Sequence, residues 1–528
     1  MIRQLLLLLK QPHEIELTTA IVNGRRADET SALRTPAIPK VCSISRNGII
    51  PTLIFTAFLL APLTAIADNA AVAYHVDPIA GADANDGLSP ATAWKSWGRF
   101  QEAAQPGSSL LLKRGCVFTL PLPLRGGSPD APVTYGAYGE GPKPILEGRI
   151  INLSRPGAWT EAAAGVWRTT TDILNVANVV FDETVCGNMR YAKEELRNKG
   201  EWFQDASGKG PLFLCCPENP ERAWKKVELV LDGNGITLKG PGASHIRIED
   251  LAIRKVGTHG IHIRDGATDV VVSRCDLSLI GGAVFRADSF SKKYGQRFVD
   301  RRVRFGNGIE TWGNASDVTV EGCRIHDIFD GGFCIQGMGG SVANNVQLRN
   351  NVFWNCGYDS MDIAHGVLAR KVVFENNTCV NAGEGWALQG EPRPRYSVNA
   401  PDNIGWHCNL ESSFAWDDRS EVSIHHNIFF NAPESRCFNY GPEKVSRSIQ
   451  VDHNCYFQRN PADAISQVGK NRYTAAEFDS YRKLTGWDEH SLVADPIFVD
   501  VAAHDFRLKP GSPCAGMGAS LNALDQQK

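Results

Sequence analysis

Carboxylates, a histidine and amides recur at matching positions of six short segments in the middle of the chain. Apolar residues alternate with other residues in each segment, which is typical of a strand with one buried face. Side chains of these polar types perform general acid–base catalysis. The segments are GIHIRDG (260–266), GIETWGN (308–314), GFCIQGM (332–338), SMDIAHG (360–366), GWALQGE (385–391) and RCFNYGP (436–442). We expect one exposed column to read His262, Glu310, Cys334, Asp362, Ala387 and Phe438.

The neighbouring outward column adds aromatic and amide side chains such as Trp312 and Gln336, which could stack on and hydrogen-bond to sugar rings. Two reactions on sugars suit such a sheet. Elimination across a uronic acid needs a base, an acid and a cation that neutralises the sugar carboxylate. Hydrolysis of a glycosidic bond needs two carboxyl groups, and in inverting enzymes these lie about 6.5–9.5 Å apart. Glu310 and Asp362 are two strands apart in one column, so their backbones should lie about 9–10 Å apart. The spacing does not choose between the reactions. The candidate catalytic residues are His262, Glu310, Asp359, Asp362 and His365.

Two long insertions flank these segments, at 285–305 and at 391–419. Long loops on a rigid scaffold commonly carry binding residues. The first insertion is basic, which suits an anionic sugar but equally suits a loop that only neutralises the acids beneath it. In an elimination, Arg302 or a bound Ca²⁺ could neutralise the sugar carboxylate, and His262, Lys292 or Tyr294 could act as the base. The predicted substrate-binding residues are Arg264, Lys292, Tyr294, Arg302, Trp312, Gln336 and Gln389.

A second repeated phrase predicts the elements that must position these side chains. It occurs as HIRIEDLAI (245–253), DVVVSRCDL (269–277), DVTVEGCRI (317–325), NVQLRNNVF (345–353), KVVFENNTC (371–379), EVSIHHNIF (421–429) and SIQVDHNCY (448–456). Short strands at a regular period, joined by glycine turns, indicate coils stacked on one another. The recurring column is Leu251, Cys275, Cys323, Asn351, Asn377, Asn427 and Asn454. Stacked rungs are about 4.8 Å apart, so we expect these asparagines to form a structural ladder of amides.

The outward positions of this second phrase have a different character. They alternate in charge and carry no aromatic residues, which predicts a solvated face of ion pairs. The residues are Glu321, Arg349, Glu375, His425 and Asp452.

With these repeats, the chain resembles the right-handed parallel β-helix proteins of the pectate-lyase-like superfamily, whose repeats are of the PbH1 type. The start, which contains GADANDGLSPATAW (81–94), and the end, ADPIFVDVAAHDFRLKPGSPCAGMGA (494–519), are similar to the first and closing segments of many secreted members. The resemblance covers about residues 74–519. It implies an all-β fold, a right-handed single-stranded parallel β-helix (solenoid) with an N-terminal capping helix. The superfamily holds lyases, hydrolases, epimerases and adhesins, so the resemblance does not fix the reaction.

The N-terminal part of the chain predicts export. The apolar run IIPTLIFTAFLLAPLTAIA (49–67) follows basic residues and ends in small residues, as a secretory signal cleaved before Asp68 would. A single membrane anchor is the alternative. We interpret residues 1–67 as signal and leader, with true initiation nearer position 41. The remaining segments are one β-helix domain (68–528) made of a cap and first coil (74–149), an irregular strand-rich part (150–235), regular PbH1 repeats (245–457) and a closing segment (458–528).

Composition narrows the partners. The formal net charge of −3 gives no broad basic surface for nucleic acid. The 14 cysteines form no CxxC pair, so most should be buried thiols and not zinc ligands. The segment DPIAGADANDG (77–87) resembles an oxygen-ligand Ca²⁺ loop, although Asx-turns that start the cap would have the same composition. Its candidate ligands are Asp77, Asp83, Asn85 and Asp86.

These observations predict a secreted or periplasmic monomer that acts on a polysaccharide and is free of the membrane once processed. β-Elimination of an acidic glycan, as in a polysaccharide lyase, is the leading prediction. A glycoside hydrolase or uronate epimerase on the same sheet is one alternative, and a non-catalytic glycan-binding or adhesion solenoid is another. Ca²⁺ is the one cofactor that the sequence suggests.

Overall fold

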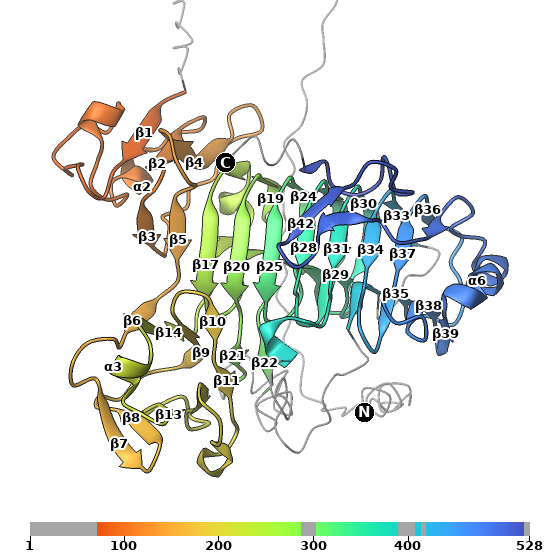
Figure 1. The fold of residues 1–528 in the computed structure, drawn as a ribbon. Coiled ribbons are helices and arrows are strands. Elements are labelled where there is room, and N and C mark those ends of the chain that lie inside the picture. The colour runs from red at the N-terminus through yellow and green to blue at the C-terminus, as the bar shows by residue number, and fades with distance from the viewer. Residues whose placement is uncertain (1–70, 287–302, 389–406, 413–418, 522–528) are drawn as a thin grey trace, which may run out of the picture. The chain divides into compact units, whose positions relative to one another are not determined.

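The computed structural model describes residues 71–286, 303–388, 407–412 and 419–521 (Figure 1). The chain divides into two compact units, Met1–Ile66 and Ala67–Lys528, and all described residues belong to the second. The predicted signal segment and the start near position 41 lie outside the described residues. In the described part, no helix is long and apolar enough to cross a membrane.

Three long sheets, built almost entirely from parallel strands, form the body of the second unit. Sheet 1 contains β1 (Ala73–Val76), β2 (Ser109–Lys113), β4 (Val133–Tyr138), β16 (Ile246–Glu249), β19 (Thr268–Ser273), β24 (Ser316–Glu321), β27 (Val342–Arg349), β30 (Leu368–Glu375), β33 (Val422–His425) and β36 (Ile449–Asp452). Sheet 2 contains β3 (Val117–Thr119), β5 (Ile145–Glu147), β17 (Ala252–Val256), β20 (Asp276–Ile280), β25 (Arg324–Ile328), β28 (Val352–Trp354), β31 (Thr378–Val380), β34 (Ile428–Phe430), β37 (Cys455–Phe457) and β40 (Leu492–Val493). Sheet 3 contains β15 (Ile236–Lys239), β18 (Ile261–Arg264), β23 (Ile309–Trp312), β26 (Phe333–Gln336), β29 (Asp359–Ile363), β32 (Cys408–Ser412), β35 (Arg436–Tyr440), β38 (Ala464–Val468) and the antiparallel edge strand β39 (Asn471–Tyr473).

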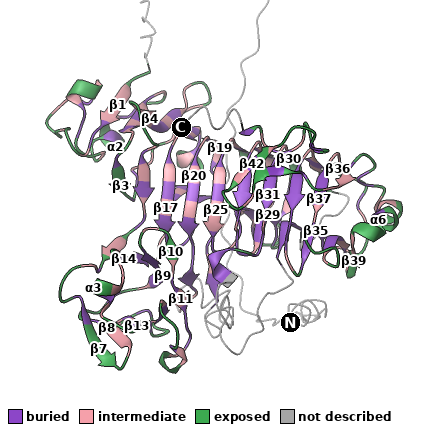
Figure 2. Cartoon of the chain, in the orientation of Figure 1, coloured by how far each residue is buried: buried purple, intermediate pink, exposed green. Residues whose placement is uncertain are grey.

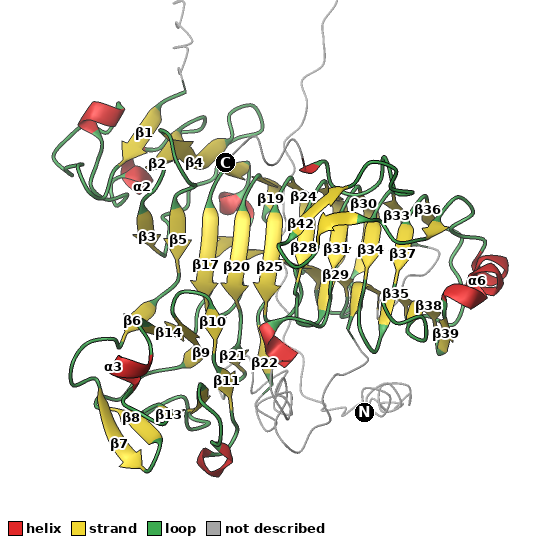
Figure 3. Ribbon diagram, in the orientation of Figure 1, coloured by secondary structure: helices red, strands yellow, loops and turns green. Residues whose placement is uncertain are grey.

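From β16 to β38 the chain passes from sheet 1 to sheet 2 to sheet 3 in each coil, and each strand pairs with its equivalent in the next coil. Figure 3 shows the strands of sheet 2 side by side, from β17 through β37. The alternating pattern buries one side of every strand in the common interior. Ile261, Ile309, Ile335 and Met361 are fully buried there, as the strand register predicted from the sequence requires. The predicted parallel β-helix is therefore confirmed.

The repeated Asn-Asn dipeptide has a distinct task at each of its two positions. Asn350 and Asn376 have positive φ angles of 56° and 53° at the corner between sheets 1 and 2, a conformation that asparagine tolerates better than most residues. The following Asn351 and Asn377 are fully buried, and Asn351 Nδ2 donates to Asn377 Oδ1 at 3.0 Å. One residue turns the chain and the next bonds adjacent coils together.

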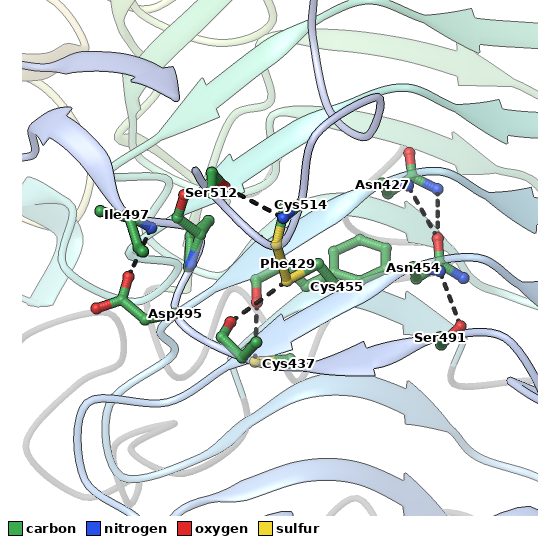
Figure 4. The surroundings of a disulfide bond; sticks show 12 residues. Asn427, Phe429, Cys437, Asn454, Cys455, Ser491, Asp495, Ile497, Ser512 and Cys514 are labelled. Carbon is green, nitrogen blue, oxygen red and sulfur yellow. Dashed lines mark hydrogen bonds between the residues drawn. A yellow bond between two sulfur atoms is a disulfide. The ribbon is translucent and has the colours of Figure 1, made fainter. Parts of the chain in front are cut away.

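The amide ladder continues to the end of the helix. Asn377 donates to Asn427, and Asn427 donates to Asn454, both at 3.0 Å. The backbone N–H of Asn454 donates to Ser491 Oγ at 2.8 Å, where the ladder ends (Figure 4). The predicted structural role of the asparagine column is confirmed.

The two ends of the solenoid have short helices and a closing segment. At the start lie the 3₁₀ helix η1 (Pro90–Thr92) and the four-residue helix α2 (Phe100–Ala103). Helix α6 (Phe478–Thr485), preceded by η5 (Ala475–Glu477), covers the other end, and the hairpin β41 (Phe498–Asp500) and β42 (Asp505–Leu508) follows. The Cys455–Cys514 disulfide joins the last coil to the closing segment (Figure 4). Ten of the eleven described free cysteines are buried, as predicted.

Residues 150–235 are strand-rich, but most of their strands pair with one another and not with the coils. They form a four-stranded sheet of β10 (Val185–Cys186), β9 (Val176–Phe181), β14 (Val227–Leu231) and β6 (Ile150–Asn152), with the fully buried Lys255 of the solenoid contacting Glu183 and Glu228. A five-stranded sheet contains β11 (Asn188–Met189), β12 (Glu201–Phe203), β13 (Phe213–Cys215), β8 (Val166–Thr169) and β7 (Trp159–Ala163). The helical turns are η2 (Lys193–Glu195) and α3 (Pro220–Ala223), and η3 (Pro241–Ala243) follows in the next coil. These strands enclose their own apolar cluster around Trp202 and Leu214.

Two positions in the predicted sheet 3 register are wrong. The described residues 385–388 of the fifth segment form no strand, because Trp386–Leu388 is the 3₁₀ helix η4, and β32 pairs with β29 on the rung predicted for it. One coil later, Phe438 pairs with the inward Leu410 and is buried in the main core, so Asn439 takes the outward position. The two errors arise together, because the insertion around 391–419 concealed one strand.

Candidate active site

The outward row of sheet 3 joins the predicted acids and histidine on consecutive rungs. Strand pairing places His262 beside Glu310, Glu310 beside Cys334, and Cys334 beside Asp362. The next pairs are Asp362 with Glu411 and Glu411 with Asn439. The outward row of sheet 3 is therefore His262, Glu310, Cys334, Asp362, Glu411 and Asn439.

This row points away from the apolar interior yet is buried, which corrects the prediction of an exposed sheet. Glu310 is 2% exposed, and Asp362 and Glu411 are 3% exposed. Every residue of β29 and β35 is buried, and these strands are purple in Figure 2. At one end, the hairpin of β21 (Ala283–Val284) and β22 (Arg304–Phe305) brings the Phe305 ring to 5.8 Å from the His259 ring. The carboxylates therefore titrate in a desolvated environment.

Glu310 is surrounded by groups that stabilise its ionised form. Its Oε2 lies 2.8 Å from His259 Nδ1 and accepts a hydrogen bond from Asn307 Nδ2 at 2.8 Å. Asn307 is held in turn, because its Oδ1 accepts from the backbone N–H of Gly331 at 3.0 Å. His259 Nδ1 also lies 3.2 Å from the backbone N–H of Asn307, and it accepts that bond only in the tautomer that does not donate to Glu310.

Two opposing effects set the pKa of Glu310. Burial raises it, but the charge and hydrogen bond of His259, the charge of His262 and the Asn307 hydrogen bond together lower it to about 2. Glu310 is thus a carboxylate across the whole physiological pH range.

His262 contacts the same carboxylate from the neighbouring rung. Its Nδ1 accepts from Asn234 Nδ2 at 3.1 Å, which leaves the proton on Nε2, and Nε2 lies 3.7 Å from Glu310 Oε1. Burial and the charge of nearby His259 lower the pKa of His262 to about 4. A neutral imidazole therefore stands beside an ionised glutamate.

Asp362 has the opposite environment from Glu310. Its Oδ2 accepts one hydrogen bond, from Gln336 Nε2 at 2.7 Å, and among the described residues its buried Oδ1 has no hydrogen-bond partner. Burial raises the pKa of Asp362 well above its usual range, and the negative charges of Glu411, Asp330 and Glu310 raise it further. Asp362 therefore keeps its proton at a pH where an ordinary aspartate has lost it.

Glu411 completes the row and was missed from the sequence. Its Oε2 accepts from Asn439 Nδ2 at 2.7 Å and lies 3.6 Å from Arg436 Nη2. Burial raises the pKa of Glu411, partly offset by the charge of Arg436 and the Asn439 hydrogen bond. Residues 408–412 alternate the apolar Cys408 and Leu410 with polar side chains, which is the pattern of a strand. The strand was missed because it lies inside the insertion at 391–419.

Asp359 also reaches the row, and glycine at position 331 makes the approach possible. A Cβ atom on Gly331 would lie 2.4 Å from Cys334 Sγ and 2.6 Å from Asp359 Oδ1. Asp359 is 1% exposed at the start of β29. Any larger residue at 331 would displace these side chains, so the close packing here depends on glycine.

The remaining predicted residues have separate positions. Gln336 contacts the row through Asp362, and the Trp312 ring lies 6.2 Å from the ring of His365. His365 is exposed beyond the end of β29 and is not part of the outward row. Arg264, at the end of β18, pairs with Asp265 at 3.0 Å and does not contact a row carboxylate in the described structure. The predicted Lys292, Tyr294, Arg302 and Gln389 lie outside the described residues.

Arg304, at the described base of the basic insertion, is a structural anchor. It is 1% exposed, and its Nη2 donates to the carbonyl of Ala177 at 2.9 Å. Its guanidinium lies over the rings of Phe329, Trp386 and Trp202. Burial lowers the pKa of Arg304 to about 10, so it remains a cation. This part of the insertion holds residues 150–235 against the coils.

The predicted calcium loop is occupied by the protein's own donors. Asp77 pairs with Lys113 at 2.5 Å. Asp83 and Asp86 accept hydrogen bonds from backbone N–H groups, whereas Asn85 donates to a backbone carbonyl. Within the described residues, the acidic and histidine side chains whose ligand atoms converge lie elsewhere, on the last coils. The backbone N–H groups of Ile79 and Leu88 donate to Asp77 and Asp86, two residues earlier in each case, which are the contacts of Asx-turns.

The right-handed β-helix is also identified by comparison with known families. Residues 234–399 match a family model described as "Right handed beta helix region". The match covers the coils that contain His262, Glu310 and Asp362. It confirms the predicted fold and its handedness.

Relatives of this chain match it only in part. An uncharacterised protein of Bacillus subtilis (strain 168), YwoF, is 28% identical over 184 residues, which are 33% of this chain and 33% of YwoF. A lacto-N-biosidase of Bifidobacterium longum subsp. longum is 35% identical over 100 residues, 17% of this chain and 6% of that protein. The chain thus spans about a third or less of the curated relatives it matches. A solved structure titled "Glycoside hydrolase" covers 83% of this chain and 99% of its own with a TM-score of 0.44 and 12% identity.

Proposed function

We propose that this protein is a carbohydrate-active enzyme that hydrolyses a glycosidic bond on the outward row of sheet 3. The observation that carries the proposal is the opposite titration of two carboxyl groups in one row. The pKa of Glu310 is lowered to about 2, whereas the pKa of Asp362 is raised well above its usual range. Paired carboxyl groups with separated pKa values are the requirement for an acid and a base at one pH.

Asp362 takes the role of the general acid. It keeps a proton that it can deliver to the leaving glycosidic oxygen, and Gln336 fixes the orientation of the carboxyl group. Glu310 takes the role of the base. Its carboxylate lies in line with Asp362 two rungs away, a backbone spacing of about 9–10 Å that leaves room for a water molecule.

Glu411 offers a different partner for the same acid. It lies one rung from Asp362, and a separation of about 5 Å is typical of retaining enzymes, in which the second carboxylate attacks the sugar. However, the pKa of Glu411 is raised and that of Glu310 is lowered, so Glu310 is the better ionised partner. We therefore propose inversion at the anomeric carbon.

β-Elimination, the leading prediction from the sequence, has less support. The prediction rested mainly on how common lyases are in the superfamily that the chain resembles and on the basic insertion at 285–305. Lys292 and Arg302 of this insertion lie outside the described residues, and the guanidinium of the described Arg304 lies over aromatic rings. The partial similarity to a lacto-N-biosidase favours cleavage of a glycosidic bond by water. It does not identify the sugar, because it covers 17% of the chain.

The test is a panel of neutral and uronate polysaccharides incubated with the purified protein. Hydrolysis predicts new reducing ends without the ultraviolet absorbance of unsaturated uronate products. Absorbance that rises with the reducing ends would replace hydrolysis with elimination. If the protein binds a glycan but releases no product from it, a non-catalytic binding function would replace both hydrolysis and elimination. With a substrate found, NMR of the first product anomer distinguishes Glu310 from Glu411 as the partner of Asp362.

We also propose that the protein is exported. The proposal rests on the apolar run 49–67 and the small residues that end it. N-terminal sequencing of the exported protein should begin near Asp68. Recovery of an uncleaved chain from a membrane fraction would instead support an anchor.

A further inference from the structure

A cluster of histidine and aspartate side chains lies on the last coils, in a part of the chain that the proposed active site does not use. Asp452 ends β36, His453 follows it in the corner, and His490 lies in the segment between α6 and β40. Their ligand atoms all lie within 4.8 Å of one another. Among the described residues, Asp452, His453 and His490 form the group of three acidic, histidine or cysteine side chains whose ligand atoms lie this close together.

The carboxylate of Asp452 is oriented by the backbone. Its Oδ1 accepts hydrogen bonds from the backbone N–H groups of His453 at 2.9 Å and His490 at 2.7 Å. Its Oδ2 lies 2.7 Å from His490 Nδ1 and 3.2 Å from His453 Nδ1. One oxygen is fixed to the chain, and the other is presented to two imidazole nitrogens.

The imidazole rings are aligned by stacking. The rings of His453 and His490 lie 4.9 Å apart at an angle of 21°. The ring of His426 also stacks with that of His453, 5.0 Å away at an angle of 13°. Parallel rings on successive coils place their nitrogens side by side. The side chains of His453 and His490 are 45% and 59% exposed, so a solvated ion can reach them.

We propose that Asp452, His453 and His490 bind a divalent transition-metal cation, with Zn²⁺ as the best fit. Two imidazole nitrogens and one carboxylate oxygen are a ligand set that Zn²⁺ prefers, and ligands about 2.0–2.1 Å from the metal lie roughly 3.3 Å from one another. The 3.2 Å separation of His453 Nδ1 and Asp452 Oδ2 matches this value. On binding, the metal replaces the proton now shared by His490 and Asp452, and His490 moves from hydrogen-bond contact to ligand distance.

The metal would join two segments that are far apart in the sequence. Asp452 and His490 are separated by 38 positions, which include helix α6. A metal held by both would fasten the closing segment to the last coil of sheet 1. An occupied site would therefore cross-link the C-terminal end and raise the stability of the folded chain.

A matched control lies on an earlier coil of the same sheet. His245 Nδ1 lies 2.8 Å from Asp269 Oδ2, the same type of contact as that of His490 with Asp452. There, Arg247 pairs with Asp269 at 2.9 Å, so a cation already stands beside this carboxylate. A general effect of surface histidines on zinc binding would involve both sites, whereas the proposed site involves only one.

The experiment is equilibrium dialysis of the full chain against Zn²⁺ after chelator treatment, with thermal unfolding recorded in parallel. The variants are His490→Ala, His453→Ala, Asp452→Asn and the control His245→Ala. We expect the first three to weaken one zinc site by more than about tenfold and to remove the zinc-dependent rise in Tm. The control His245→Ala should keep both the zinc affinity and the zinc-dependent rise in Tm. His490→Gln serves if His490→Ala is poorly folded, because it keeps a polar side chain without the ligand nitrogen.

Three results would overturn the proposal. The wild-type chain could bind no zinc at concentrations well above that of the protein. The double variant His453→Ala/His490→Ala could bind zinc as tightly as the wild type, which would place the ion elsewhere. The control His245→Ala could weaken binding as much as His490→Ala, which would show a non-specific histidine effect.

Discussion

The outward row of sheet 3 and the outward row of sheet 1 are built by the same coils from the same alternating pattern, yet they differ in environment. Glu310 in sheet 3 has a side chain 3% exposed, whereas Glu321 in sheet 1 is 44% exposed. Along sheet 1, Arg349 lies 3.5 Å from Glu321, and His425 lies 3.5 Å from Glu375. In the sheet 1 row the polar side chains face water, with the Arg349 cation beside the Glu321 carboxylate, whereas the sheet 3 row gathers three carboxyl groups out of water.

The difference shows that residue type alone does not assign function on a β-helix. An exposed ion pair contributes about 0–1 kcal/mol and leaves its carboxylate with ordinary chemistry. In a buried position the neighbouring groups decide the protonation state, because a buried carboxyl group ionises only where cations and hydrogen-bond donors favour the charge. Glu310 has such neighbours and Asp362 has other acids, and their pKa values separate accordingly.

The largest expected effect is on activity. Replacing Asp362 by Asn keeps the shape and removes the proton that the leaving group needs. Activity on the substrate identified by the glycan panel should fall by a factor of about 10²–10⁴. The matched control is Glu375→Gln in the exposed row, which should keep nearly full activity. Equal losses in the two variants would remove the distinction between the rows.

The second effect is on stability. Glu310→Gln removes the buried carboxylate that His259 Nδ1 contacts and to which Asn307 Nδ2 donates, and loss of a hydrogen bond to a charged group costs about 1.5–3 kcal/mol. The cost follows from burial, because the same change at an exposed glutamate would cost about 0–1 kcal/mol. Denaturant unfolding measures the cost. A change below that of an exposed pair would show that His259 and Glu310 are not coupled.

The third effect is on the pH dependence of unfolding. The folded pKa of Glu310, about 2, is below its ordinary value of 4.5, so its stabilising contribution is present above 4.5 and is lost as the pH falls towards 2. The pKa of Asp362 is raised, so its contribution is present at low pH and is lost as the pH rises through the raised value. Glu310→Gln should therefore flatten the acid side of the stability curve. Asp362→Asn should leave that side unchanged and flatten the other.

The smallest effect is expected in the exposed row itself. Glu321→Gln breaks the contact with Arg349 at the cost of about 0–1 kcal/mol, and added salt should reduce even this difference. Unfolding at low and high ionic strength measures it. A larger and salt-independent cost would mean that the sheet 1 row is desolvated as well.

The sequence predicted the fold well because the fold depends on local patterns that repeat. Alternation placed Ile335 and its equivalents in the core, and the asparagine column predicted the ladder that joins Asn351 to Asn454. Because the pattern repeats, the predicted register of each strand could be checked against that of the next. The register failed only where the insertion after residue 388 interrupted the period.

The candidate site was less predictable because its properties are not local. The sequence placed Glu310 and Asp362 in one column, but Glu411 was hidden in the insertion, and no pattern showed that the row would be buried. Glu310 contacts His259 and Asn307, which both precede their strands. Asn307 is only three residues away in the same turn, but His259 is brought to the row by the stacking of coils.

The most direct test of the account is the protonation of Asp362 and Glu310, measured by infrared difference spectroscopy of the carboxyl stretch. Spectra of the wild type, Asp362→Asn and Glu310→Gln would be compared at a pH above the usual aspartate range, so that signals common to all three cancel. We predict that a protonated carboxyl band is lost in Asp362→Asn and retained in Glu310→Gln. Loss of that band in Glu310→Gln, or its persistence in Asp362→Asn, would contradict the assignment of acid and base.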